Sequence, residues 1–327
     1  MKITLLRGAG MAAVTLALSL GAGLAQAAKV LGDWTPVFQG IDYLTAYETD
    51  VQYPGEAGLR RLAVNAMRID LTDPGIRFMT TPGNGTLAGD TQSQTTGAFL
   101  EQHDLQVAVN ANFFSPCCAA ATQPKDLTGL AISEGQVVSP ADYNSIPPGG
   151  TADSLVITQD NRAAITHVAP GSDVSLFYSA VSGGPVLVNA GEIAVSLAPA
   201  DSWSAQNPRT AVGISADGSF LLLMTIDGRQ PGYSEGATLY ETASWLLALG
   251  AYQGLNLDGG GSTSMVMADA DGDAQYLNRL SAGAPRFNGN HLGVYAAALP
   301  VPEPSTYLML AIGLLVLAAA TRGRRMR

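Results

Sequence analysis

The chain has 327 residues and is acidic, with 17 lysines and arginines against 27 aspartates and glutamates. The acidic excess lies in residues 28–298, because residues 1–27 and 299–327 hold basic residues and a single glutamate. An acidic body argues against nucleic acid, and against an anionic surface, as a partner bound through charge. The length of the body is compatible with one large domain.

Residues 1–27 have the three parts of a secretory signal peptide. Lys2 and Arg7 give a charged start, an apolar run covers residues 11–24, and AQA at residues 25–27 matches an A-x-A cleavage site. We therefore expect export of the chain and removal of this segment.

Short apolar runs bounded by glycine, proline, asparagine and aspartate cover residues 28–298 and predict a mostly β domain. ISEGQVV, ITQDNRAAI and ISADGSFLLL place turn residues between apolar runs and predict three hairpins. Helices are predicted at Thr95–His103 and at Leu239–Leu249, the second ended by Gly250. We expect an α+β fold, a single β-rich domain of mixed sheets with a few helices. The predicted strands are Leu62–Leu71, Gln106–Asn110, Ser154–Thr158, Pro185–Val188, Ala211–Ser215, Phe220–Ile226, Gly254–Leu257, Ser264–Met267 and His291–Ala296.

One strand–helix–strand unit carries two carboxylates. The strand Phe220–Ile226 runs into Asp227, and after the helix the strand Gly254–Leu257 runs into Asp258. If these strands are parallel neighbours, the unit is a βαβ crossover, and both carboxylates lie at the sheet edge where ligands of open sheets bind. Paired carboxylates can divide acid and base work in glycosyl transfer to water. The alternative is that both residues only form turns, since Asp-Gly is a common turn dipeptide.

Three glycines follow Asp258 in the stretch GLNLDGGGSTSMV. Glycine loses more backbone entropy on folding than other residues, so a run of three indicates a close approach to the bare backbone. Successive N–H groups can cradle an anion, yet the stretch fits no P-loop, G-x-G-x-x-G or G-x-S-x-G pattern. With only three histidines in the chain, a Ser-His-Asp triad has few possible bases.

Arginines and asparagines beside predicted strand ends complete the set of polar candidates. Arg209, Arg229 and Arg286 offer guanidinium groups that suit phosphate oxygens, although surface ion pairs are the usual role of arginine. Asn110 and Asn112, in VNANFFSP, suit hydrogen bonds to sugar hydroxyls or to an acetamido group, or else turn formation.

Two further patterns bear on disulfides and metals. Cys117 and Cys118 are the only cysteines, and in an exported chain they favour a vicinal disulfide that stiffens a loop, or a bond to another chain. Two thiols alone fall short of the four ligands of a closed zinc site. ADADGDA at residues 268–274 hints at calcium, but it lacks the glycine and glutamate of an EF-hand loop and favours a solvated hairpin tip. No cofactor is predicted, and a structural divalent cation is left open.

The C-terminal segment, residues 299–327, also has three parts. A proline-rich linker contains PEP at residues 302–304, an apolar run covers residues 307–320, and four arginines lie beyond it. An apolar run followed by positive charge is a stop-transfer pattern and predicts membrane insertion. The arrangement resembles the PEP-CTERM sorting tail. This resemblance implies an exosortase as partner, with an inner-membrane anchor before processing and the cell surface or matrix as destination.

The order of NANFFSP, SGGPVLV, NPRTAVGI, IDGRQPGY, NLDGGGSTSMV and APRFNGNHLGV resembles the phosphodiester glycosidase family over roughly Leu62 to Ala297. The resemblance implies hydrolysis of a sugar-1-phosphodiester, with envelope or exopolysaccharide glycans as the substrates of bacterial members. The family pattern points to Asn110, Asn112, Arg209, Thr210, Asp227, Arg229, Asp258, Gly259, Gly260, Gly261, Ser262, Thr263, Arg286, Asn290 and His291.

We therefore expect an exported hydrolase in which arginines hold the phosphodiester of a glycan or sugar phosphate. Asp258 is expected to be the nucleophile or the base, and Asp227 the partner acid or a group that orients Arg229. Two alternatives come from other classes of protein: a non-catalytic glycan-binding matrix protein, and a metal-dependent phosphodiesterase that cleaves the P–O bond.

Overall fold

The computed structural model describes residues 29–51, 58–118, 121–142, 152–195, 205–300 and 313–314. The predicted signal peptide lies outside the described residues, and so does the predicted membrane segment apart from residues 313–314. Within the described ranges, no helix has both the length and the apolar character needed to cross a bilayer.

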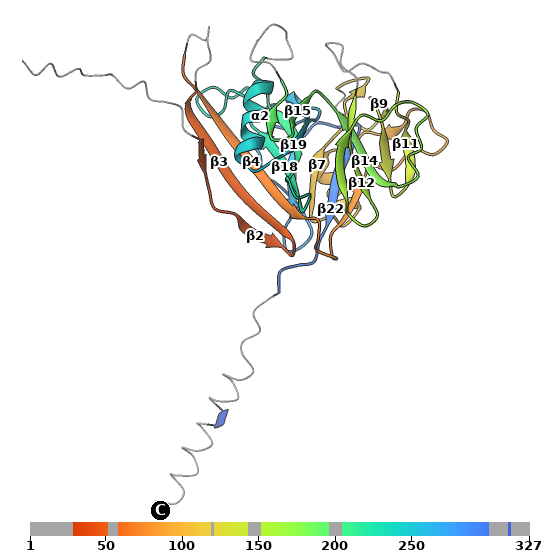
Figure 1. Cartoon of the computed structure of the whole chain (residues 1–327), viewed down its shortest axis with the longest axis horizontal. Helices are drawn as coiled ribbons and strands as arrows, with labels where there is room; N and C mark the ends of the chain where they lie inside the picture. The colour runs from red at the N-terminus through yellow and green to blue at the C-terminus, as the bar shows by residue number, and fades with distance from the viewer. Residues whose placement is uncertain are drawn as a thin grey trace, which may run out of the picture.

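The largest sheet has nine strands (Figure 1). Its strands are β1 (Lys29–Leu31), β2 (Thr35–Phe38), β3 (Ile41–Val51), β4 (Arg60–Asp70), β15 (Val186–Asn189), β16 (Glu192–Ile193), β17 (Arg209–Ile214), β18 (Phe220–Ile226) and β19 (Gln253–Asn256). Their order is β1-β3-β4-β18-β17-β19-β15-β16, and β2 pairs with β3.

Three smaller sheets complete the domain. The first has the order β11-β10-β14-β12-β13, the second β21-β20-β7-β22-β5 and the third β6-β9-β8. The strands are β5 (Arg77–Thr80), β6 (Thr91–Gln92), β7 (Val107–Asn110), β8 (Phe114–Ser115), β9 (Pro124–Leu127), β10 (Ala131–Ser133), β11 (Gln136–Ser139), β12 (Asp153–Thr158), β13 (Ala163–Thr166), β14 (Phe177–Gly183), β20 (Met265–Ala268), β21 (Ala274–Tyr276) and β22 (His291–Tyr295).

All the predicted strands are present within two residues of the expected bounds, and so are both helices, α1 (Thr96–Gln102) and α2 (Leu239–Ala248). The three predicted hairpins are the pairs β10–β11, β12–β13 and β17–β18. The α+β class is therefore confirmed. Every strand pair among the described residues is antiparallel, however, so the expectation of mixed sheets is wrong.

The expected crossover of neighbouring parallel strands is not formed. β18, α2 and β19 follow one another along the chain, but β17 lies between β18 and β19 and pairs antiparallel with both. β18 and β19 therefore run in the same direction without pairing. Because of this shared direction, Asp227 after β18 and Asp258 after β19 still lie at the same end of the sheet.

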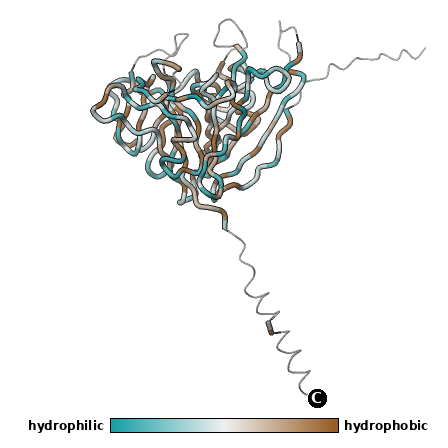
Figure 2. Tube along the Cα trace, turned by 180° about the vertical axis from the view of Figure 1, so that it is seen from behind, coloured by the Kyte–Doolittle hydropathy of each residue, from teal (hydrophilic) through white to brown (hydrophobic). Residues whose placement is uncertain are grey.

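The large sheet is buried on both faces by side chains that alternate along its strands. In β18, Leu221 and Leu223 pack with the core shared by the smaller sheets, whereas Leu222 and Met224 pack with the buried Trp245 of α2. Figure 2 shows brown, apolar stretches interleaved with teal, hydrophilic ones along the chain of the domain. Fully burying one such side chain stabilises the fold by roughly 1.5–3 kcal/mol, so the sheet is a rigid support for its end loops.

The start of α2 is fixed by both local and distant contacts. Thr238 and Glu241 form a capping box, in which each side chain accepts a hydrogen bond from the backbone N–H of the other residue. Glu241 also accepts a bond of 2.6 Å from the buried guanidinium of Arg60 on β4. The helix is thereby held against the same end of the sheet at which Asp258 lies.

Candidate active site

Asp258 follows β19 directly, and its backbone is held by the neighbouring sheet. The Asp258 N–H donates to the Ala111 carbonyl at 2.9 Å, and the Asp258 carbonyl accepts from Asn110 Nδ2 at 2.5 Å. The other end of the Asn110 amide accepts from Thr210 Oγ1 at 2.7 Å and from the Ser264 N–H at 3.0 Å. Asn110 and Thr210, both predicted to bind substrate, thus position the loop that carries Asp258.

The carboxyl of Asp258 has a raised pKa. It is only partly exposed, and burial raises its pKa from 3.8 to about 6. The Ser262 hydroxyl, the Arg286 guanidinium and the Gly259 N–H act against this rise in pKa. A carboxyl with this pKa is largely ionised at pH 7 and can still take up a proton, as acid–base catalysis requires.

The three glycines allow close contacts that side chains would prevent. A Cβ on Gly259 would lie 2.8 Å from the Pro208 carbonyl oxygen. A Cβ on Gly260, whose φ is +63°, would lie 3.0 Å from Nη2 of Arg229, and one on Gly261 would lie 2.1 Å from Nη2 of Arg286. The bare backbone therefore admits two guanidinium groups beside Asp258.

A pocket of about 180 Å³ opens beside this loop. It is lined by Phe113, Asn207, Arg209, Arg229, Asn256, Leu257, Asp258, Gly259 and Gly260. Arg209 is buried and donates from Nε to the Ala237 carbonyl at 2.9 Å, and its burial lowers the pKa to about 10. Arg229 is exposed, and its Nη2 donates to Asn207 Oδ1 at 2.8 Å.

Arg286 contacts the glycine loop, where its Nη1 donates to the Ser262 hydroxyl at 3.3 Å. Ser262 is buried and is the last residue of a short 3₁₀ helix, η1 (Gly260–Ser262). Arg209 and Arg229 thus line the pocket together with Asp258, and Arg286, from a third segment, acts on the charge of Asp258. A carboxylate beside several guanidiniums suits a ligand that combines a neutral ring with an anionic phosphate.

Asp227 lies in a separate buried cluster and does not line this pocket. Its Oδ2 accepts from Tyr233 Oη at 3.0 Å and from the Arg279 N–H at 3.1 Å, and burial raises its pKa. A hydrogen bond from Asn278 acts against this rise in the pKa of Asp227. Nδ2 of Asn278 donates to the Thr263 carbonyl at 3.2 Å. Asn278 therefore links Asp227 to the glycine loop, and the role of Asp227 as partner acid stays a prediction.

The remaining predicted residues form a buried network under the loops. Asn112 Oδ1 accepts from Asn290 Nδ2 and from the Ser182 N–H, both at 2.9 Å. His291 is fully buried, its Nδ1 lies 2.9 Å from Thr81 Oγ1, and burial lowers its pKa to about 3. Thr263 is also buried. The structure thus separates residues that line the pocket from residues that hold the underlying strands together.

A model of the phosphodiester glycosidase family matches residues 103–295, which is more than half of the chain. The chain belongs to the phosphodiester glycosidase family. It is therefore an enzyme, a hydrolase of the glycosidase class. A second match, to the PEP-CTERM protein-sorting motif, covers residues 300–325 and indicates export and surface sorting of this glycosidase.

Solved structures share the fold of this phosphodiester glycosidase at low sequence identity. The catalytic domain of zebrafish N-acetylglucosamine-1-phosphodiester α-N-acetylglucosaminidase, auto-inhibited by its pro-peptide, is 17% identical, with a TM-score of 0.57 over 82% of this chain and 88% of that one. A Synechocystis protein of unassigned function is 18% identical (TM-score 0.55), covering 81% of this chain and 64% of its own length. A Burkholderia pseudomallei protein is 16% identical (TM-score 0.56), covering 83% and 97%. No curated protein matches the chain.

Several pocket residues of the glycosidase were not predicted. Phe113, Asn207 and Asn256 line the pocket, and Tyr233 and Arg279 surround Asp227. Phe113 and Asn256 are adjacent to the predicted motifs, in NANFFSP and NLDGGG, so their position in the sequence was a usable signal. Asn207 and Tyr233 also lie within quoted motifs, NPRTAVGI and IDGRQPGY, so the same signal was available for them.

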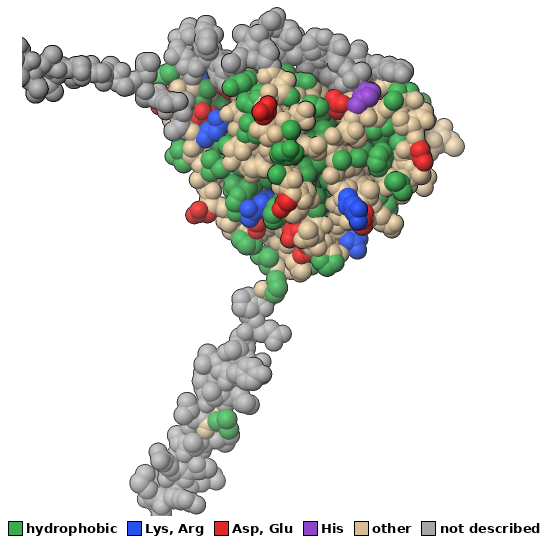
Figure 3. Space-filling view, viewed as in Figure 1, with side chains coloured by type: hydrophobic (Ala, Val, Ile, Leu, Met, Phe, Trp, Pro, Cys, Tyr) green, Lys and Arg blue, Asp and Glu red, His purple; other side chains and the backbone are tan. Residues whose placement is uncertain are grey.

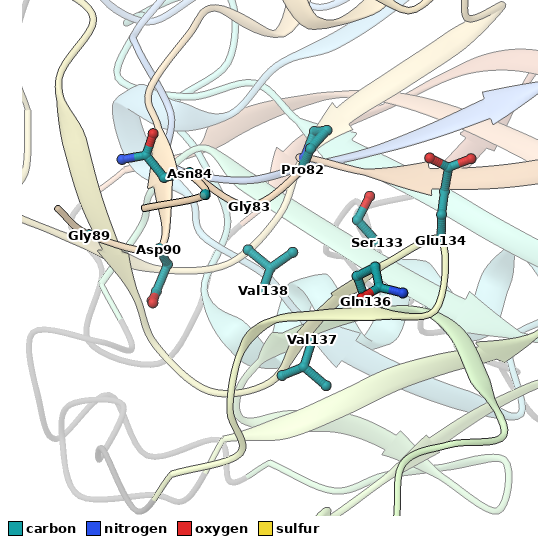
Figure 4. A pocket seen from close by; sticks show the side chains of 11 residues that line it. Pro82, Gly83, Asn84, Gly89, Asp90, Ser133, Glu134, Gln136, Val137 and Val138 are labelled. Carbon is teal, nitrogen blue, oxygen red and sulfur yellow. The ribbon is translucent and has the colours of Figure 1, made fainter. Parts of the chain in front are cut away.

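A larger hollow of about 520 Å³ lies between the loop after β5 and the hairpin β10–β11 (Figure 4). Its polar lining includes Asn84, Asp90, Glu134 and Gln136, and none of its lining residues is a lysine or an arginine. Figure 4 shows Asp90 and Glu134 on opposite sides of the hollow. None of the predicted site residues lines it, so the chemistry of the family points to the smaller pocket.

The two remaining sequence patterns have structural explanations. Cys117 and Cys118 form a vicinal disulfide. The ADADGDA segment forms the tip of the β20–β21 hairpin, where the Asp269 carboxylate accepts from the N–H groups of Asp271 and Asp273 at 3.0 Å. In the part of the chain that the structure describes, no group of three or more histidine, cysteine, aspartate or glutamate side chains forms a metal site.

Proposed function

We propose that this glycosidase hydrolyses the bond between the anomeric carbon of a sugar and a phosphodiester, in envelope or extracellular polysaccharide. The single observation that carries this proposal is the position of Asp258, with a raised pKa, beside the guanidiniums of Arg229 and Arg286 across a loop of bare glycines. Exopolysaccharide as the setting is supported by the sorting motif at residues 300–325.

In the proposed complex, Arg229 and Arg286 hold the phosphodiester, and Arg209 adds positive charge from the buried side of the pocket. Charge-assisted hydrogen bonds from guanidinium groups are short and directional, so they would fix the phosphate relative to Asp258. The glycine loop leaves room for the sugar ring against the backbone. The small pocket, about 180 Å³, would enclose one sugar unit and leave the rest of the substrate outside.

The chemistry needs only one working carboxyl near the anomeric carbon. The bond from the anomeric carbon to the phosphate oxygen breaks, and the phosphate monoester leaves with that oxygen. A phosphate leaves without prior protonation, so the absence of Asp227 from the pocket is compatible with hydrolysis. The ionised Asp258 either takes a proton from the attacking water or attacks first and is then released by water.

The test is turnover of a panel of sugar-1-phosphodiesters, varied in the sugar and in the aglycone, by the purified chain. We expect release of the free sugar and of a phosphate monoester. Hydrolysis in water enriched in oxygen-18 decides which bond breaks, because C–O cleavage places the label in the sugar. Label in the phosphate would establish P–O cleavage and refute the proposed chemistry.

A further inference from the structure

The pocket and the C-terminal exit of the folded domain lie at opposite ends of the large sheet. At the pocket end, Arg209 of β17 pairs with Ile226 of β18, and Ile226 pairs with Val64 of β4. At the other end, Leu221 of β18 pairs with Ile69. Leu221 and Ile226 are five residue steps apart along β18, which is about 17 Å at the rise of an antiparallel strand.

The last strand, β22, leads the chain away from the pocket. His291 pairs with Asn110, which binds the Asp258 backbone, whereas Tyr295 pairs with Arg77 at the far end. Beyond β22, the Ala297 carbonyl accepts from the Gln39 N–H at 2.9 Å, just before β3 begins. In Figure 1 the described chain after β22 leaves the domain at the end opposite α2 and the loops after β19.

The chain between the domain and the apolar run is too short to reverse this orientation. Seven residue steps join Pro300 to Tyr307, and a fully extended chain of that length spans at most roughly 25 Å. β4 alone, with its 11 residues, runs for about 34 Å between the exit end and the pocket end. Arg60, at the pocket end of β4, donates to the Gly236 carbonyl beside the loop that contains Asn207.

We propose that the C-terminal tail holds this glycosidase with its pocket facing away from the surface of attachment. The enzyme then acts on sugar phosphodiesters of other molecules, such as extracellular glycans, and not on headgroups of lipids in that surface. This inference rests on the proposed function for its substrate, and on the fold together with attachment through the C-terminal tail for its orientation. The acidic body, whose visible face in Figure 3 has only scattered basic side chains, also gives no charge attraction to an anionic surface.

Activity in vesicles tests the inference directly. The full chain, recovered with phosphatidylcholine vesicles by flotation, is given the same sugar-1-phosphodiester either as a soluble methyl ester or as the headgroup of a lipid in the same vesicle. We expect the ratio of lipid to soluble turnover to be at least tenfold lower than in a variant with 20 Gly/Ser residues inserted after Pro304. Equal ratios for the two linkers would overturn the inference.

A second measurement is independent of turnover, so it separates this inference from the proposed function. A dye is attached through Leu59→Cys at the pocket end of β4, or through Thr72→Cys at its exit end, both at exposed residues. Energy transfer to an acceptor dye in the vesicle should be weaker from position 59 than from position 72, and the long linker should reduce the difference. Stronger transfer from position 59 would refute the orientation. Absence of turnover together with the expected dye result would refute only the proposed function.

Discussion

The replacement Gly261→Ala should separate activity from stability in this glycosidase. The new Cβ would lie 2.1 Å from Nη2 and 2.5 Å from Cζ of Arg286, far inside contact distance. The atoms that must move belong to the end of a flexible side chain and not to the backbone. Gly261 does not have a positive φ, so alanine fits its backbone without strain.

The expected magnitudes follow from this displacement. If Arg286 holds the phosphate, its loss removes a hydrogen bond to a charged group, worth about 1.5–3 kcal/mol. This corresponds to a decrease in kcat/KM of about 10- to 150-fold. The free energy of unfolding should stay within about 1 kcal/mol of wild type, because Gly→Ala at a compatible position restricts the unfolded chain.

The assay is kcat/KM for a sugar-1-phosphodiester together with denaturant unfolding of the same samples. Gly58→Ala is the matched control, because its Cβ would meet nothing within 4 Å. Gly259→Ala is the opposite control, since its Cβ would lie 2.8 Å from the Pro208 backbone oxygen and should reduce stability. Wild-type kcat/KM in Gly261→Ala would show that Arg286 does not act on the substrate.

Three further outcomes are expected. Asp258→Asn should lower kcat by about 10²- to 10⁴-fold. In the wild type, kcat/KM should rise with pH through about 6 in a pH–rate profile, and a flat profile would exclude Asp258 as the ionising group. Because burial raises the pKa of Asp258 from 3.8 to about 6, ionising this carboxyl lowers the free energy of unfolding of the wild type as pH rises from 4 through 6. The free energy of unfolding of Asp258→Asn should therefore exceed that of wild type by up to about 3 kcal/mol at pH 8 and equal it at pH 4. Glu241→Ala should cost about 3–5 kcal/mol in urea unfolding, because the buried Arg60 guanidinium loses its carboxylate partner, and Arg60→Met with Glu241→Gln should cost less; equal losses would refute the pairing argument.

The strands that sequence patterns predicted are those whose apolar runs are short and bounded by turn residues. β18 and β19 are examples, and both were found within one residue. β3, in contrast, was not predicted although it has 11 residues. Its sequence, IDYLTAYETDV, mixes charged and apolar side chains, and its Glu48 is buried in the structure. Burial of a charged residue beside Lys29 is a tertiary effect that a local pattern does not contain.

Strand order was the main error, and it has a specific cause. The hairpin β17–β18 was predicted, and so was the pair of strands joined by α2. One edge of β18 pairs with β4, so a single edge is left for both predicted partners, and the local antiparallel hairpin takes it. β19 then pairs with the free edge of β17 through Ala211 and Asn256, which places one strand between the two carboxylates. Sequence alone gave no means to rank a short-range pair against a longer crossover.

The glycines after Asp258 were the clearest local signal for the candidate site. Arg209 and Arg229 line the pocket with Asp258, Arg286 contacts Ser262 of the glycine loop, and no spacing in the sequence relates Arg229 to Arg286. The bare backbone of Gly260 and Gly261 is the only local sign that two large side chains approach the same loop. The carboxylate pair was a weaker guide, because a second carboxylate in this pocket would oppose binding of an anionic phosphate. The arginines near Asp258 instead favour an anionic ligand, and the separation of Asp227 from Asp258 is consistent with that electrostatic requirement.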